Sequence, residues 1–147
     1  ALSIVHRNHY AELEENRGVN ARALISELST ALKAGDTGNR AFSVQLRSDD
    51  VRLTQDVAVP IAFLVTEMVE MAMTIDPKAA IHISIHRMDE ERARMELQSA
   101  ALQESDQLQS LLDGQYGRVL TGLSRQLRAP LSHDGATGTY IIVIPAM

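Results

Sequence analysis

The chain of 147 residues is long enough for one domain with a sizeable core, and its 45% hydrophobic and 22% charged residues are close to the average for globular proteins. We expect no transmembrane segment and no signal peptide, and the absence of cysteine excludes disulfides, thiolate metal sites and a cysteine nucleophile. A net charge of −5, scattered arginines and 3% aromatic residues argue against a nucleic-acid partner, which needs a clustered basic face or a stacking platform.

The spacing of apolar residues predicts an order of helices and strands. Apolar residues at helical spacing predict helices, and alternation with polar residues predicts strands. The expected elements are the end of a helix at 1–15, a helix at 20–33 with Asn20 as its N-cap, strands at 42–46 and 51–54, and a helix at 56–75 with Asp56 as its N-cap. They continue with strands at 81–86 and 93–98 joined by a hairpin at the charged run 88–92, a helical stretch at 105–127 that Gly114 and Gly117 interrupt early, a turn at 134–138 and a strand at 139–144. Hairpins that alternate with helices predict an α/β fold, with helices packed on one face of a mixed sheet.

The histidines do not predict a metal site. His82 and His86 are four apart on an expected strand, which places them on one face but roughly 13 Å apart, too far to share a metal. We interpret both as solvated residues of a polar sheet face. His6 and His9 are three apart on an expected helix and could share a metal, but no third ligand accompanies them.

Two further segments have weak functional signals. His133 and Asp134 are adjacent in an expected turn, which is typical of turn chemistry rather than of an acid–base dyad. No Gly-x-Ser-x-Gly surrounds Ser132, so a hydrolytic triad is unsupported. Gly114 and Gly117 open an expected helical segment, where a glycine-rich N-terminus can cradle an anion. Two glycines three apart more often mark a loop-to-helix transition.

Four segments together resemble one protein family, in the same order along the chain. The stretch 57–72, VAVPIAFLVTEMVEMA, resembles the N-box helix of bacterial sensor histidine kinases, in particular of the HWE-type and neighbouring subfamilies. The stretch 114–120 resembles the late glycine box of that family, and 138–145 resembles its closing strand. Residues 5–10 resemble the end of the second dimerisation helix.

The resemblance implies a fold and a setting. The fold would be the GHKL (Bergerat) type, an α+β sandwich with a mixed sheet of about five strands backed by about three helices. Residues 1–17 would be the end of a dimerisation helix, and 18–147 the ATPase-like domain. The implied setting is cytoplasmic two-component signalling, with a response regulator or a partner histidine kinase as partner. A homodimer would form through upstream helices, without nucleic acid and without membrane contact by this chain.

Two departures from the family pattern bear on activity. Active members present an N-box asparagine that ligates Mg²⁺; the matching residue here is Met71, whose thioether is a poor ligand for a hard cation. The family also has an Asp-x-Gly-x-Gly box whose aspartate binds adenine. The matching stretch 97–103, LQSAALQ, has neither residue type. Glu67, the candidate base, remains, and Gly114 and Gly117 would be a vestigial nucleotide site.

These observations leave three hypotheses. The first is a degenerate, pseudokinase-like domain without cofactor or metal, which acts by binding a response regulator or partner kinase, or supports phosphotransfer or phosphatase activity. The second is a divergent kinase that still uses ATP and Mg²⁺, with Glu67 as base, Gly114 and Gly117 near the phosphates, and Glu70 or Asp106 in place of the lost ligands. The third is a structural dimerisation domain.

Overall fold

A computed structural model describes residues 18–35 and 41–147. The expected helix at 1–15, the His6–His9 pair and the dimerisation segment 1–17 lie outside the described residues. The helices are α2 (Ala21–Ala34), α3 (Gln55–Ile75), the 3₁₀ turn η1 (Ala100–Leu102), α4 (Asp106–Asp113) and α5 (Gln115–Leu127). The strands are β1 (Val19–Asn20), β2 (Ser43–Ser48), β3 (Arg52–Leu53), β4 (Ala80–Arg87), β5 (Arg92–Gln98), β6 (Ser132–Asp134) and β7 (Thr139–Pro145).

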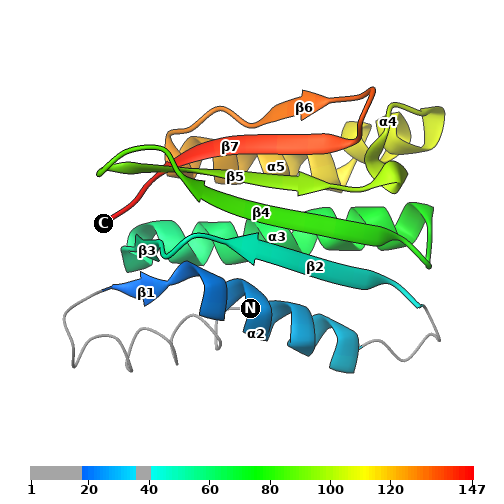
Figure 1. The fold of residues 1–147 in the computed structure, drawn as a ribbon. Coiled ribbons are helices and arrows are strands. Elements are labelled where there is room, and N and C mark those ends of the chain that lie inside the picture. Colours follow the sequence, from blue (N-terminus) through cyan, green and yellow to red (C-terminus); the bar gives the residue numbers. More distant parts are fainter. Residues whose placement is uncertain (1–17, 36–40) are drawn as a thin grey trace.

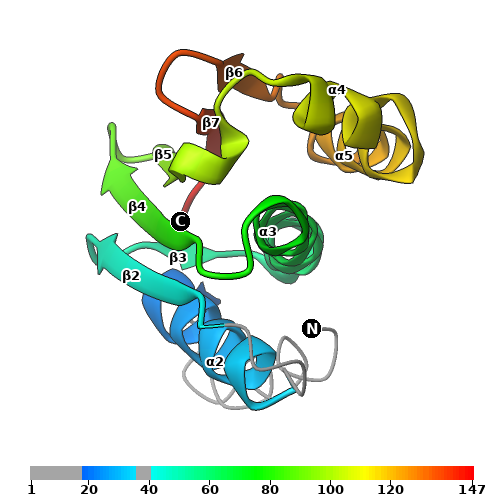
Figure 2. The same cartoon turned by 90° about the vertical axis from the view of Figure 1, so that its right-hand side faces the viewer.

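Five strands form one mixed sheet with helices on one of its faces (Figures 1 and 2), which confirms the predicted architecture. The strand order is β2-β4-β5-β7-β6, with β2 parallel to β4 and the other neighbours antiparallel. The short β1 and β3 pair separately, antiparallel, beside this sheet. Helices α2 and α3 lie side by side, and α5 lies on the other side of α3 (Figure 2).

The core is the layer between the sheet and the helices, and α3 is central to it. In β4, Ile81, Ile83 and Ile85 point to the helices and are buried, as their alternation with polar residues predicts. Contrary to expectation, α3 is long and apolar enough by composition to span a membrane. In the fold, however, 61% of its most apolar window is buried in the domain. The hydrophobic character of α3 is therefore accounted for by its central packing position.

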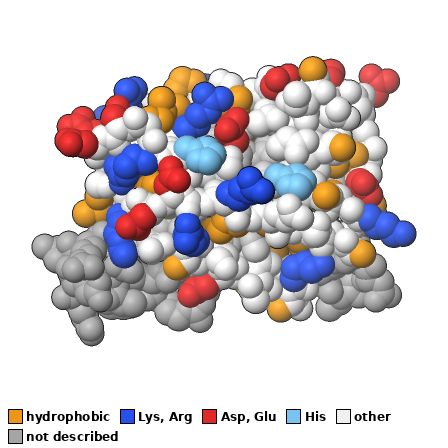
Figure 3. Space-filling model, in the orientation of Figure 1, with side chains coloured by type: hydrophobic (Ala, Val, Ile, Leu, Met, Phe, Trp, Pro, Cys, Tyr) orange, Lys and Arg blue, Asp and Glu red, His pale blue; other side chains and the backbone are white. Residues whose placement is uncertain are grey.

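The other face of the sheet is polar. His82 and His86 of β4 are exposed there, as predicted from their alternation with buried isoleucines. Figure 3 shows this face with histidine, basic and acidic side chains intermixed. His86 Nδ1 makes a weak ion-pair contact with Asp49 Oδ2 at 3.8 Å, and both side chains are about half exposed. The two histidines are therefore surface residues.

Of the two predicted N-caps, that of α2 is confirmed and that of α3 is wrong. Helix α2 begins after Asn20, whose Oδ1 accepts a hydrogen bond from the backbone N–H of Ala23 at 3.0 Å, so this predicted cap is confirmed. The N-cap of α3 is Thr54, two residues before the expected cap Asp56, which lies in the first turn of the helix. A negative charge in that turn is still favourable to the helix dipole.

The helical stretch expected at 105–127 is divided into two helices, at the glycines expected to interrupt it. Gly114 ends α4 and precedes α5, with φ −101° and ψ −145°, which breaks the helical path. Gly117 lies against the end of α4, since a Cβ on it would stand 1.8 Å from the backbone oxygen of Leu112. Glycine is therefore required at 117 for the close approach of α5 to α4.

The expected turn at 134–138 also contains part of a strand. His133 and Asp134 belong to β6, which pairs with β7, so the assignment of both to a turn was wrong. The turn itself begins at Gly135, and Gly138 within it has φ +73°, a conformation that favours glycine. A Cβ on Gly138 would meet the backbone oxygen of Ser99 at 2.0 Å, so the turn packs directly against the end of β5.

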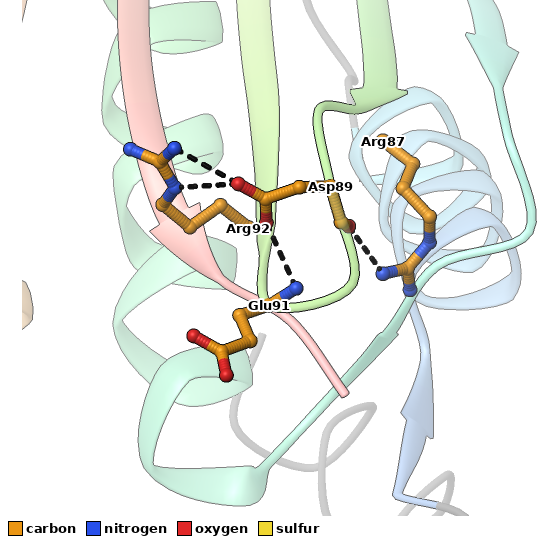
Figure 4. A network of polar contacts seen from close by, with 4 residues as sticks. All are labelled: Arg87, Asp89, Glu91 and Arg92. Atoms are coloured by element: carbon orange, nitrogen blue, oxygen red, sulfur yellow. Dashed lines mark hydrogen bonds and ion pairs between the residues drawn. The ribbon is translucent and has the colours of Figure 1, made fainter.

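The hairpin between β4 and β5 is closed by Asp89 (Figure 4), at the connection predicted from the charged run 88–92. Its carboxylate accepts hydrogen bonds from the backbone N–H of Glu91 at 2.9 Å and from Arg92 Nη2 at 2.8 Å. The bond from Glu91 has the largest effect on the pKa of Asp89, and both bonds lower it. Arg87 donates to the backbone oxygen of Asp89 at 2.9 Å and to that of Met147 at 2.7 Å. The network positions the hairpin against the C-terminal residues.

Candidate functional site

The position that matches the family's magnesium ligand lies inside the core. Met71 is 0% exposed on α3. Helix α3 contacts both η1 and α4, and their residues Leu102 and Leu108 are buried in the same hydrophobic cluster. The thioether is therefore a packing group in this structure, surrounded by apolar neighbours rather than by oxygen ligands.

The position that matches the family's adenine box is a 3₁₀ turn. Ser99 is 1% exposed, and its Oγ accepts a hydrogen bond from the backbone N–H of Ala101 at 3.3 Å. The backbone N–H of Ser99 donates to Gly138 O at 3.0 Å, and the N–H of Leu102 donates to Ser99 O at 2.9 Å. The polar groups of Ser99 are thus satisfied within the fold, which leaves none of them unpaired for an adenine.

Glu67 is half-buried on α3, one turn before Met71. Burial raises the pKa of its carboxyl above the ordinary value, and the nearby charge of Glu70 raises it further. A carboxylate with a raised pKa is suited to accept a proton. Glu67 is not among the residues that line the two cavities described next.

Glu70 lines a cavity of about 360 Å³ between α2, α3 and α5, together with Thr74 and Tyr116. Asp106, the other carboxylate considered as a replacement ligand, is exposed in the first turn of α4 and does not line this cavity. Within residues 18–35 and 41–147, no group of three or more histidine, aspartate or glutamate residues could hold a metal ion.

A larger cavity of about 860 Å³ contains both glycines singled out from the sequence. Gly114 and Gly117 line it at the junction of α4 and α5, so the structure brings them together but separates them from Glu67. The remaining walls come from α5, from the strands β6 and β7 and from the segment before β6. Of its polar residues, His133 had been interpreted only as part of a turn, and sequence reasoning missed Arg118, Thr121, Arg125 and Tyr140.

The inner wall of this larger cavity is formed by two stacked rings. The centroids of His133 and Tyr140 lie 4.4 Å apart with an angle of 21° between the planes. His133 Nε2 donates a hydrogen bond to the backbone oxygen of Leu102 at 2.8 Å. The hydroxyl of Tyr140 is buried without a hydrogen-bond partner among the described residues, and burial, with a smaller contribution from Glu104, raises its pKa to about 12. The phenol is therefore neutral at physiological pH.

Comparison with known proteins gives a structural likeness only. The sequence matches no protein-family model and no curated protein. The fold resembles that of the blue-light activated histidine kinase EL346 of Erythrobacter litoralis, with a TM-score of 0.76 and 18% identity, over 99% of this chain and 45% of that one. The chain thus spans less than half the length of that protein.

Two other solved structures agree. The histidine kinase domain of EL346 alone gives a TM-score of 0.73 at 18% identity, over 99% of this chain and 70% of that one. The histidine kinase AdeS of Acinetobacter baumannii gives a TM-score of 0.64 at 11% identity, over 99% of this chain and 74% of that one. The likeness to EL346 is consistent with the HWE-type resemblance of the N-box segment. The chain has the GHKL fold of histidine kinase catalytic domains.

Proposed function

We propose that this domain is a cytoplasmic module of two-component signalling that acts by binding a response regulator or a partner histidine kinase, and that it does not transfer phosphate from ATP. The observation that carries the proposal is the complete burial of Met71 at the position of the family's magnesium ligand. Metal stabilisation of the transferred phosphoryl group contributes several kcal/mol in kinases. A core methionine cannot supply it.

The segment after β5 supports the same proposal. The stretch 97–103 that matches the adenine box has no aspartate, and the hydroxyl of Ser99 within it caps η1, so no charged acceptor would meet the adenine amino group. A hydrogen bond to a charged group contributes about 1.5–3 kcal/mol. Its loss together with that of the metal ligand is expected to weaken nucleotide binding by orders of magnitude.

Calorimetric titration of the chain with ATP and ADP, with and without Mg²⁺, tests the proposal. We expect no heat of binding at micromolar nucleotide concentrations, and no transfer of labelled phosphate from ATP. In parallel, immobilised domain is expected to bind receiver domains from the same genome. Magnesium-dependent ATP binding in the micromolar range would overturn the proposal, as would transfer of labelled phosphate from ATP to the protein.

A divergent kinase is the second candidate, and the raised pKa of Glu67 favours it, because a carboxylate with a pKa above the ordinary value is a stronger base for removing a proton from an attacking histidine. In that case ATP and Mg²⁺ would have to use Glu70 in the smaller cavity. Substitution Glu67→Gln separates the candidates. It would abolish phosphate transfer by a kinase and would leave the partner affinity of a binding module unchanged.

A further inference from the structure

The larger cavity, between α5 and the strands β6 and β7, has the size of a small-molecule site. Its volume is about 860 Å³, within the usual range for such sites. Leu120, Leu131 and Tyr140 give it an apolar floor. Gly114 and Gly117 line one end of it, but no described residue of α3 does, so it does not include the helix that would hold a nucleotide's metal. We propose that this cavity binds a small organic anion, whose apolar body lies on the floor and whose carboxylate or phosphate group is bound by Arg118 and Arg125.

The two arginines supply the charge. Arg118 and Arg125 are seven residues apart on α5, which places them about two turns apart on the same face of the helix. Both line the cavity, and neither guanidinium has a hydrogen bond or an ion pair with any residue that the structure describes. Guanidinium groups bind carboxylate and phosphate oxygens through two parallel hydrogen bonds. Thr121, which also lines the cavity between them, adds a hydroxyl.

The acidic residue of the cavity does not cancel this charge. Asp113 lies at the end of α4, and its Oδ1 accepts a hydrogen bond from Gln109 Nε2 at 2.9 Å. Ser124 is also occupied, since its Oγ donates to the backbone oxygen of Ala129 at 2.5 Å. Two unpaired cations therefore face one carboxylate, which favours an anionic ligand.

Gly122 is an independent indication that α5 leaves space for a ligand. It lies inside α5, where glycine costs about 1 kcal/mol relative to alanine. A Cβ on it would meet no atom within 4 Å, so packing inside the domain does not require glycine at this position. Gly122 lines the cavity, and a missing side chain there lets another molecule approach the helix backbone.

Tyr140 also lines this cavity, and its hydroxyl is buried. Tyr140 is 4% exposed and lines the cavity, while its hydroxyl oxygen has no hydrogen-bond partner among the described residues. Buried polar groups are almost always paired, so an unpaired one requires an explanation. The oxygen is closed off from solvent in this conformation. A ligand in the cavity would therefore contact the ring of Tyr140 rather than its hydroxyl.

Titration followed by amide chemical shifts tests the proposal. The probes are benzoate and phenyl phosphate, with benzamide as the neutral analogue and inorganic phosphate as an anion without an apolar body. We expect at least one organic anion to shift amides of α5, β6 and β7 saturably, with both controls at least about tenfold weaker. The tighter of the two anions identifies the head group. Absence of saturable shifts from both anions at millimolar concentration, or shifts confined to other elements, would overturn the proposal.

Matched variants locate the site. The double substitution Arg118→Gln with Arg125→Gln is expected to weaken binding at least about tenfold. Arg47→Gln with Arg94→Gln makes the same change in net charge on the polar face of the sheet and is expected to leave affinity unchanged. Equal losses in both double variants would mean non-specific attraction and would overturn the proposal. Because no nucleotide is used, failure here leaves the proposed signalling function untouched.

A substitution that fills the cavity gives a second, charge-independent test. Gly122→Leu places its side chain in open space beside α5, so the fold is expected to tolerate it. The added side chain occupies volume that the ligand's apolar body needs. Loss of organic-anion binding with an unchanged fold supports the site, and unchanged binding contradicts it.

Discussion

His133 and Tyr140 face each other across the pair of strands at the sheet edge, with their rings stacked 4.4 Å apart. The same histidine is hydrogen-bonded to the backbone of Leu102, so the stacked pair connects the edge strand β6 to η1. Offset stacking of this kind contributes about 0.5–1.5 kcal/mol beyond the area that it buries. The ring of Tyr140 is therefore stabilising, whereas its unpaired hydroxyl is not.

The substitution Tyr140→Phe separates these two contributions. It keeps the ring and removes a buried O–H group that lacks a partner among the described residues. We expect the free energy of unfolding to stay unchanged or to rise by about 1 kcal/mol, since an unpaired buried donor is costly. Urea unfolding measures it. Tyr140→Ala is the control and is expected to lower the free energy of unfolding by about 3 kcal/mol or more.

A fall of more than about 1 kcal/mol for Tyr140→Phe would contradict this expectation. It would mean that the hydroxyl has a hydrogen-bond partner in solution, such as an ordered water molecule. The hydroxyl would then give no support to the proposed ligand site, whereas the support from the arginines and from Gly122 would be unaffected.

Restoring the family's asparagine is not expected to restore a metal site. Met71 lies in the apolar core, so Met71→Asn buries an amide among apolar groups. We expect a loss of about 2–4 kcal/mol in the free energy of unfolding and no gain of magnesium-dependent ATP binding. Chemical unfolding and calorimetry measure the two effects. Met71→Leu, which keeps the apolar volume, is expected to cost less than about 1.5 kcal/mol.

Gain of ATP binding by Met71→Asn would show that one residue alone had closed the nucleotide site. In that case η1 and α4, which contact α3 and cover this region, would have to move aside without a large cost. The proposed loss of phosphate transfer would then rest on Met71 and not on the segment after β5.

Much of the fold could be predicted because its main elements are amphipathic. Alternating isoleucines predicted β4, and the leucines of 20–33 predicted α2 with its Asn20 cap. The three-residue strand β6 is too short for periodicity to show, and it exists because β7 offers it a pairing edge. The break at Gly114 was expected from the glycines at 114 and 117, although the apolar spacing of α4 and α5 continues across it.

The candidate site was harder to predict than the fold. The sequence spacing of Arg118 and Arg125 predicts that both lie on one face of a helix. The residues opposite these arginines cannot be predicted from the sequence, because β6, the stacked ring of His133 and the turn between α4 and α5 come together only in the folded domain. Likewise, the sequence identified Met71 as a poor metal ligand but could not predict that η1 and α4 would cover α3.

Two glycines of α5 are expected to respond oppositely to alanine. Gly117→Ala would place a Cβ 1.8 Å from the backbone oxygen of Leu112, and backbone cannot move aside as a flexible side chain can. We expect a loss of at least about 2 kcal/mol in the free energy of unfolding. Gly122→Ala meets no atom and is expected to stabilise the domain by about 0.5–1 kcal/mol. Thermal unfolding measures the change in stability of each variant. Equal shifts in melting temperature for the two variants would contradict the packing of α4 on α5.

The carboxyl of Glu67 is expected to make stability depend on pH. Because burial and Glu70 raise its pKa in the folded state above the ordinary value of 4.5, the folded domain holds the proton more tightly than the unfolded chain. The associated stability is present below that ordinary value and is lost as pH rises through the folded pKa. At neutral pH the charged group therefore destabilises the domain.

The substitution Glu67→Gln removes this cost. We expect it to raise the free energy of unfolding at pH 7 by less than about 0.5 kcal/mol, since solvent screens the charge of a half-buried group. The gain should shrink to zero as pH falls below 4.5, and urea unfolding across that range measures it. Glu96→Gln, a carboxylate on the polar face of the sheet that is ion-paired with Arg94, is the control and is not expected to become more stable at pH 7. A gain for Glu67→Gln that persists in acid would mean that the glutamine improves packing, and that the carboxyl of Glu67 has an ordinary pKa.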